Sequence, residues 1–184
     1  MDKILQAVRD FADKAHGNQT RKYSPERYIV HPIRVMETVR EYSSDMAMLA
    51  AALLHDVVED TPVSSRELLD FLESVMDHDT ANLVLRYVTE LTDVFTKAAY
   101  PRLNRRARKT RELMRLASTS PQSQTIKYAD ILDNAKDVVE HDPDFAKVFL
   151  KEYRAVLKTC DKGNEDLRAR AAALVEEGLE MGDL

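Results

Sequence analysis

The stretch "AALLHDVVEDTP", residues 51–62, joins the most apolar run of the chain to a cluster of polar groups. The apolar run, Met46–Leu54, is far shorter than the roughly 20 residues that span a bilayer, so it predicts a buried core helix. Four ionisable residues follow it within six positions: His55, Asp56, Glu59 and Asp60. Because packed carboxylates repel one another, this cluster needs a compensating partner.

The composition favours one helical domain. The 184 residues are 44% apolar, which is enough for one cooperative core, so we predict a single domain over residues 1–184. Residues that break helices are scarce, with four Gly and six Pro, whereas Ala, Leu, Glu, Lys and Arg are frequent. The sequence therefore predicts an all-α fold.

Charge and cysteine content exclude several classes of protein. The formal net charge of −5 and the pI near 5.6 argue against a general nucleic-acid binder, because such a surface repels the phosphate backbone. Cys160 is the single cysteine, so no internal disulfide is possible, and the first residues do not resemble a signal segment. We expect a cytoplasmic protein with no membrane partner.

Apolar residues recur at helical spacing along most of the chain. The helix predicted at 2–15 ends before Gly17, and Ser64 with Glu67 three residues on forms a capping-box pattern. The segment 18–32 lacks this spacing and predicts a loop, of a length that often carries function. Further helices are predicted at residues 32–42, 45–60, 64–76, 79–92, 99–117, 121–141, 143–160 and 164–180.

The polar cluster after Leu54 predicts a metal site. On a continuous helix, His55 shares a face with Glu59. Asp56 in the same way shares a face with Asp60. A divalent metal is the simplest cation that would compensate the carboxylates. The alternative for the acidic pair is a solvated loop, since a charge run usually faces water.

Two other segments can supply further ligands. His31 lies where the long loop meets a helix, although a lone histidine there is more often structural. Asp130 follows apolar residues in a predicted helix, where an unpaired carboxylate would cost several kcal/mol. Two His and two Asp with open positions fit Mn²⁺, Fe²⁺ or Zn²⁺ in a hydrolytic role. His78 and His141 are interpreted as surface residues at helix ends.

The order of these residues resembles a known family. His31, then His55-Asp56, then Asp130 is similar to the H…HD…D signature of HD-domain metal-dependent phosphohydrolases. Together with "RKYSPERYIVHP", "ELTD" and "KYADILDN", it resembles the hydrolase domain of Rel/SpoT-type alarmone enzymes. The nearest match is the stand-alone small alarmone hydrolases, which include the metazoan SpoT homologues. The resemblance runs from about Ala15 to Tyr153.

The resemblance implies a fold, a cofactor and a reaction. The fold would be an all-α HD-domain helical bundle, and the reaction would release pyrophosphate from the 3′ position of guanosine tetraphosphate or pentaphosphate. Glu59 and Asp60 match the acidic pair of active members, which would orient the attacking water and take its proton. One Mn²⁺ would be held by His31, His55, Asp56 and Asp130.

The resemblance also implies nucleotide contacts, in which an Arg suits both stacking on a base and pairing with phosphate. The implied contacts are Arg21, Lys22, Arg102, Arg106, Asn134 and Tyr153. The basic residues within 99–117 have an alternative interpretation, a solvated face paired with acidic neighbours. The chain departs from the family pattern at Ile131, Asp133, Lys136 and residues 24–27, which lie among the substrate contacts and not among the metal ligands.

Two other functions compete with this prediction. One is a phosphatase acting on another nucleotide with a phosphorylated ribose, such as NADPH. The other is a nucleotide-sensing module without catalysis, which Glu59 and Asp60 argue against because carboxylates repel an anionic ligand. The sequence does not predict an oligomeric state.

Overall fold

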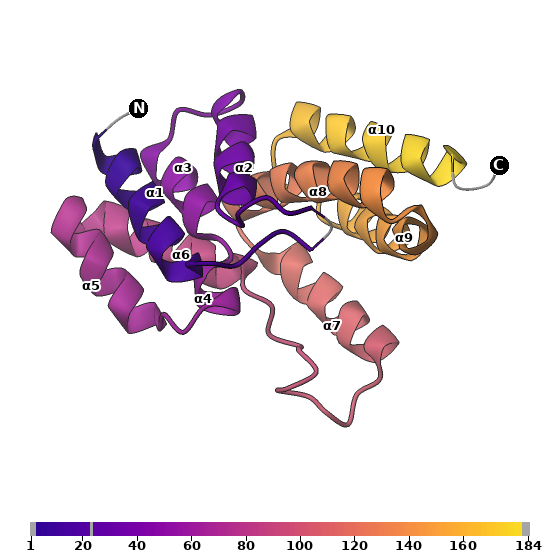
Figure 1. Cartoon of the computed structure of the whole chain (residues 1–184), viewed down its shortest axis with the longest axis horizontal. Coiled ribbons are helices and arrows are strands. Elements are labelled where there is room, and N and C mark those ends of the chain that lie inside the picture. Colours follow the sequence, from indigo (N-terminus) through magenta and orange to yellow (C-terminus); the bar gives the residue numbers. More distant parts are fainter. Residues whose placement is uncertain (1–2, 23, 182–184) are drawn as a thin grey trace. The chain divides into compact units, whose positions relative to one another are not determined.

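The computed structural model describes residues 3–22 and 24–181, except for the side chains of residues 143–145. It divides into two compact units, Met1–Thr92 and Asp93–Leu184, which are described separately. Within the described residues there is no strand, and one isolated bridge pairs Thr20 with Arg27. The predicted all-α fold is therefore confirmed (Figure 1).

The first unit is built around a helix that is apolar on every side. Its helices are α1 (Lys3–His16), α2 (Val30–Arg40), α3 (Met46–Leu54), α4 (Val57–Asp60), α5 (Ser65–Val75) and α6 (His78–Leu91). Every residue of α3 after Met46 is buried, and α1, α2 and α6 pack against it. Burial on all sides is what an all-round apolar helix requires. The helix begins at Asp45, whose carboxylate accepts hydrogen bonds from the N–H groups of Ala47 and Met48.

The start of α5 follows from a local sequence pattern. The capping box predicted from Ser64 and Glu67 is confirmed, with hydrogen bonds in both directions at the start of α5. This helix packs against α6, and Phe71 stacks on Phe11 of α1 with ring centroids 4.0 Å apart.

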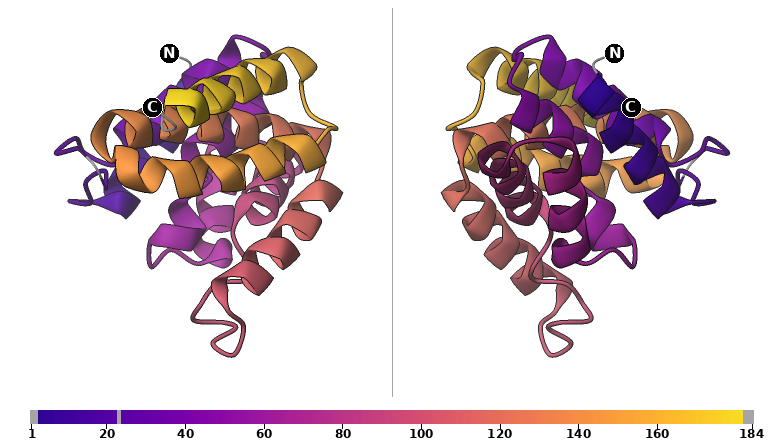
Figure 2. Two further views of the ribbon diagram at one scale, coloured as in Figure 1. Left: turned by 90° about the vertical axis from the view of Figure 1, so that its right-hand side faces the viewer. Right: turned by 90° about the vertical axis from the view of Figure 1, so that its left-hand side faces the viewer.

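The second unit is organised around its longest helix. It contains α7 (Arg105–Ser118), α8 (Pro121–His141), α9 (Pro143–Thr159) and α10 (Glu165–Met181). Helices α8, α9 and α10 run side by side and pack against one another, as Figure 2 also shows. Gln124 accepts a hydrogen bond from the N–H of Lys162, and the Tyr128 hydroxyl donates to the carbonyl of Cys160 at 2.7 Å. These bonds attach the α9–α10 connection to α8.

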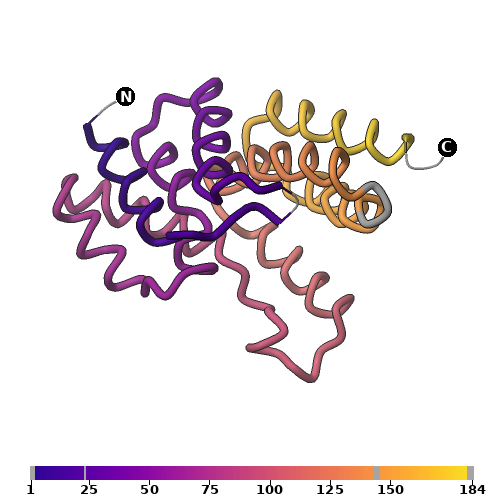
Figure 3. The backbone as a smooth tube through the Cα atoms, in the orientation of Figure 1, coloured from indigo at the N-terminus to yellow at the C-terminus, as the bar shows by residue number. Residues whose placement is uncertain are grey.

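Two predicted helices differ from the observed ones. The helix expected at 45–60 is wrong in its continuity, because α3 ends at Leu54 and a separate turn, α4, begins at Val57. The helix expected at 99–117 starts later, because Asn104 caps the N–H of Ala107 and residues 93–104 form an irregular loop (Figure 3). Among the described residues, no helix combines the length and apolar character needed to cross a membrane.

Candidate metal centre

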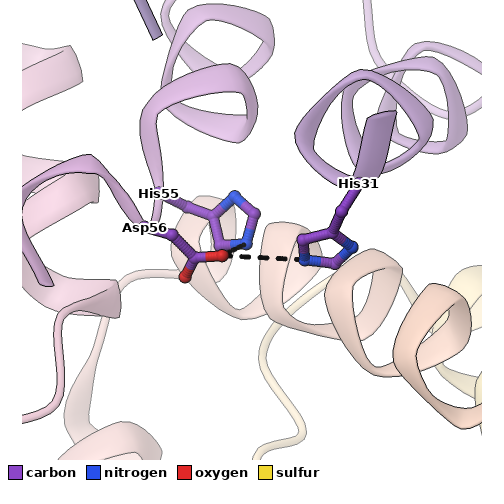
Figure 4. A group of neighbouring side chains, drawn as sticks. All are labelled: His31, His55 and Asp56. Carbon is purple, nitrogen blue, oxygen red and sulfur yellow. Dashed lines mark ion pairs between the residues drawn. The ribbon is translucent and has the colours of Figure 1, made fainter. Parts of the chain in front are cut away.

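Two histidines and one aspartate of the first unit come together where three helices begin or end (Figure 4). His31 lies in the first turn of α2 and is 1% exposed. His55 caps the end of α3 and is 3% exposed, and Asp56 precedes α4. The break between α3 and α4 therefore lies at the site itself.

The three side chains direct one atom each toward a common point. Asp56 Oδ2 lies 3.0 Å from His55 Nε2 and 3.7 Å from His31 Nε2. One such ligand atom from each residue lies within 4.8 Å of the others. His55 Nδ1 is 2.8 Å from the carbonyl oxygen of Ala52, which only accepts, so Nδ1 carries the proton. A neutral His55 therefore presents the lone pair of Nε2 to the site.

This donor set fits a divalent metal ion. Imidazole nitrogen and carboxylate oxygen bind Zn²⁺ at about 2.0–2.2 Å, so ligand atoms 3.0 and 3.7 Å apart can share one ion. The hydrogen bond from His55 to Ala52 is the kind of outer contact that orients a metal-binding histidine. Two nitrogens with one oxygen suit Mn²⁺, Fe²⁺ or Zn²⁺ better than a cation that prefers oxygen alone.

Tyr28 links the Asp56 carboxylate to the acidic pair, Glu59 and Asp60. Its hydroxyl donates to Asp56 Oδ2 at 2.6 Å, and the same oxygen lies 3.3 Å from Asp60 Oδ2. Loss of solvent around Asp60 raises the pKa of its carboxyl, and the nearby Asp56 charge raises that pKa further. The Tyr28 hydrogen bond acts in the opposite direction. Both members of the acidic pair, Glu59 and Asp60, are exposed residues of α4.

Sequence reasoning missed three residues beside this site. Tyr28 carries the hydrogen bond to Asp56, and His16 and Gln19 form a second set of contacts that reaches the Asp60 main chain. A signal for Tyr28 was present, since it lies three residues before His31 at the start of α2. His16 carried no comparable signal, because it ends a helix next to Gly17.

The predicted nucleotide contacts of the first unit differ in exposure. Arg21 is 7% exposed, and its guanidinium carbon lies 6.0 Å from the centre of the Tyr28 ring, within the range of a cation–π contact. Lys22 is exposed. Arg21 is therefore held beside the metal cluster, and Lys22 faces solvent.

The other predicted site residues belong to the second unit. Asp130 of α8 is 4% exposed and is compensated by Lys127 Nζ at 2.8 Å. Asn134 Nδ2 donates to the same carboxylate at 2.6 Å. The prediction that a buried Asp130 needs partners therefore agrees with its surroundings. Tyr153 is 9% exposed and packs against Phe149.

The basic cluster around α7 separates into two groups. Arg105 pairs with Glu152, and Lys109 pairs with Asp93, as expected for a basic face with acidic neighbours. The two residues predicted to bind phosphate, Arg102 and Arg106, are exposed and make no ion pair within the part of the chain that the structure describes.

Comparisons with known proteins place these features in a family context. Residues 8–158 match the HD domain family. Guanosine-3′,5′-bis(diphosphate) 3′-pyrophosphohydrolase MESH1 of Mus musculus is 34% identical, over 95% of this chain and 94% of the mouse protein. The Homo sapiens protein of that name is 37% identical, over 74% of this chain and 69% of its own length.

A solved structure has a similar fold over nearly the whole chain. It is described as a metazoan ortholog of SpoT that hydrolyzes ppGpp, and it matches with a TM-score of 0.79 and 26% identity. The match covers 97% of this chain and 98% of that one. The chain spans only 9% to 21% of the longer curated relatives that it matches in Synechocystis sp., Mycoplasma pneumoniae and Aquifex aeolicus.

Proposed function

Because the chain belongs to the HD-domain family, and within it to the group of hydrolases that includes MESH1, we propose that it hydrolyses guanosine tetraphosphate or pentaphosphate. The products would be GDP or GTP and pyrophosphate. The observation that carries this proposal is the convergence of His31, His55 and Asp56, with Tyr28 and Asp60 beside them. The printed names of the MESH1 relatives support the same substrate.

We propose Mn²⁺ as the bound ion, with Asp130 as the fourth ligand. The mixed nitrogen and oxygen donor set is compatible with Mn²⁺, and the sequence resemblance supports both the choice of Mn²⁺ and the role of Asp130. When bound, a divalent ion supplies Lewis acidity, which lowers the pKa of a water at the site toward neutrality. We also propose that residues 1–184 act as one domain, because the family match at residues 8–158 runs through both units.

The residues of the chain would handle the proton and the orientation of the water. The oxygen of water forms a bond to the phosphorus next to the ribose, and the bond from that phosphorus to the 3′-oxygen breaks. One proton leaves the water for a carboxylate, and one proton is gained by the departing 3′-oxygen. Asp60 or Glu59 would take the first proton, and the Tyr28 hydroxyl lies 3.3 Å from Asp60 Oδ2.

Cationic side chains would bind the phosphates. A protein with a net charge of −5 has to concentrate such residues near the site to hold a substrate with four or five phosphates. We assign the purine and its phosphates to Arg21 and Lys22, and outer phosphate contacts to Arg102 and Arg106. Asn134 and Tyr153 complete the proposed nucleotide contacts by resemblance.

The proposal includes where the protein acts and what it binds. A single buried cysteine without a disulfide partner in the chain is consistent with a cytoplasmic enzyme. The partner would be a small nucleotide, and the acidic net charge supports neither nucleic acid nor an anionic membrane surface as a partner.

Turnover of two substrates by metal-stripped protein tests the proposal. Guanosine tetraphosphate and NADPH are each incubated with and without Mn²⁺, and the products are separated by anion exchange. We expect Mn²⁺-dependent release of GDP and pyrophosphate, which Asp56→Asn abolishes while leaving the fold intact. Asp70→Asn, a change to an exposed carboxylate paired with Arg66 on α5, is the matched control and should keep full activity.

The other outcomes select the competing functions. Phosphate released from NADPH, with guanosine tetraphosphate left intact, would keep the metal site and change the substrate. Binding of either nucleotide without any product would favour the sensing module over an enzyme.

A further inference from the structure

His16 is a buried histidine that the metal cluster does not use. It is the last residue of α1 and is 4% exposed. Its Nδ1 lies 2.9 Å from Gln19 Oε1, and Gln19 Nε2 donates to the backbone carbonyl of Asp60 at 2.8 Å. Two consecutive hydrogen bonds therefore connect the end of α1 to the last residue of α4.

The chemistry of these groups fixes the tautomer of His16. A backbone carbonyl can only accept, so the Gln19 atom that faces Asp60 must be the amide nitrogen. The other end of that amide, Oε1, can only accept as well, so His16 Nδ1 must donate to it. A neutral His16 is therefore protonated on Nδ1. Its Nε2 is buried and has no hydrogen-bond partner within the described residues.

The ring of His16 makes a second contact with the site. It packs on the ring of Tyr28, with centroids 4.4 Å apart and planes inclined by 32°. The hydroxyl of Tyr28 is the group that reaches both Asp56 and Asp60. His16 thus supports the Asp60 backbone through Gln19 and the Asp60 carboxylate through Tyr28.

The short helix α4 needs such support. It has four residues, which is one turn, and an isolated turn does not hold its own geometry because helix nucleation is unfavourable. A second anchor is the Thr61 hydroxyl, which donates to the carbonyl of Val57 at 2.6 Å within the same turn. The Gln19 contact links the carbonyl at the end of this turn to the loop that follows α1.

We propose that His16, in its Nδ1-protonated form, is a positioning residue that holds the acidic pair of α4 in place for the hydrolytic reaction. This inference rests on the proposed function, because the acidic pair is the group that accepts the proton. If the only role of His16 were to fill space, an apolar side chain would do so without burying a ring nitrogen that lacks a hydrogen-bond partner, which costs about 1–3 kcal/mol. The other ring nitrogen, Nδ1, donates the hydrogen bond to Gln19, and this bond is the reason for a histidine at the position.

Substitutions that keep or remove one ring nitrogen test the proposal. In His16→Asn the side-chain amide can reproduce the Nδ1 donor, whereas in His16→Gln it lies near the place of Nε2. We expect His16→Ala and His16→Gln to lower kcat about 10–100-fold, with KM close to wild type, and His16→Asn to recover most of kcat. His78→Ala removes a histidine of the same unit that is 75% exposed, and it should change neither constant.

A second measurement does not depend on turnover. Nitrogen-15 spectra of the imidazole in the wild-type protein should show the proton on Nδ1 of His16, and His16→Ala should shift the signals of Tyr28 and Asp60. If the wild type turns over no alarmone, the proposed function fails, while these spectra still test the positioning contacts. A proton on Nε2 would overturn the inference. So would a His16→Asn variant as impaired as His16→Ala at equal thermal stability, or a His16→Ala variant with normal kcat.

Discussion

Removal of the Tyr28 hydroxyl by Tyr28→Phe should weaken metal binding. This hydroxyl donates to Asp56 Oδ2 at 2.6 Å, which is in the range of a charge-assisted O–H···O⁻ bond. Hydrogen bonds to charged groups contribute about 1.5–3 kcal/mol, and about 1.4 kcal/mol is a factor of ten in affinity. In metalloproteins, removal of a side chain that orients a metal ligand typically lowers metal affinity about 10–100-fold, which agrees with this range. We expect Mn²⁺ affinity to fall by that factor.

Calorimetric titration of metal-stripped protein with Mn²⁺ measures the effect directly. The matched control is Tyr100→Phe, since the Tyr100 ring packs on Phe95 and its hydroxyl makes no hydrogen bond among the residues that the structure describes. The control should bind Mn²⁺ like the wild type. An unchanged affinity in Tyr28→Phe, with an unchanged melting temperature, would refute the assignment of Tyr28 as the group that orients Asp56.

Further substitutions and probes test the site and the second unit. Asp60→Asn should reduce kcat more than Glu59→Gln, because Asp60 Oδ2 lies 3.3 Å from the Tyr28 hydroxyl that also contacts Asp56; steady-state rates decide this, and an equal loss in both variants would contradict it. Burial raises the pKa of the Cys160 thiol to about 11, so a maleimide should label it only when urea unfolds the protein. The raised pKa also means that its contribution to stability is present below the unfolded pKa and is lost as pH rises toward about 11, which alkaline melting curves would detect. A Cβ at Gly163 would lie 2.5 Å from a neighbouring tyrosine ring, so Gly163→Ala should destabilise the fold by about 1–3 kcal/mol in urea titration. Glu112→Ala should speed amide exchange at the two backbone N–H groups after α6 that this buried carboxylate accepts, with a stability loss of about 1–3 kcal/mol.

Features that depend on neighbouring residues in the sequence could be predicted. Ser64 and Glu67 form their capping box within one turn, so the pattern contains all the groups that make it. The burial of α3 likewise follows from an apolar run without polar interruption. The compensation of Asp130 was also foreseeable, because its partners Lys127 and Asn134 lie within one turn of it on α8.

Features that depend on distant partners could not be predicted. No Gly or Pro marks the break at His55 and Asp56, where Asp56 has φ −100° and ψ −4°. The turn is stabilised by contacts such as the hydrogen bond from Tyr28, which is 28 residues away in the sequence. Gln19 reaches the Asp60 carbonyl across 41 residues, and no local pattern contains that pairing.

The histidines, more than the repulsion among carboxylates, favour a metal ion at this cluster. Glu59 is exposed, where water screens its charge, and Tyr28 offsets part of the repulsion between Asp56 and Asp60. His55, however, uses its Nδ1 proton on a backbone carbonyl and places Nε2 at 3.0 Å from a carboxylate oxygen. Two lone pairs at that distance repel each other, and a cation between them removes the repulsion. A proton would satisfy His55 alone, whereas the convergence of a third ligand atom from His31 favours a divalent metal.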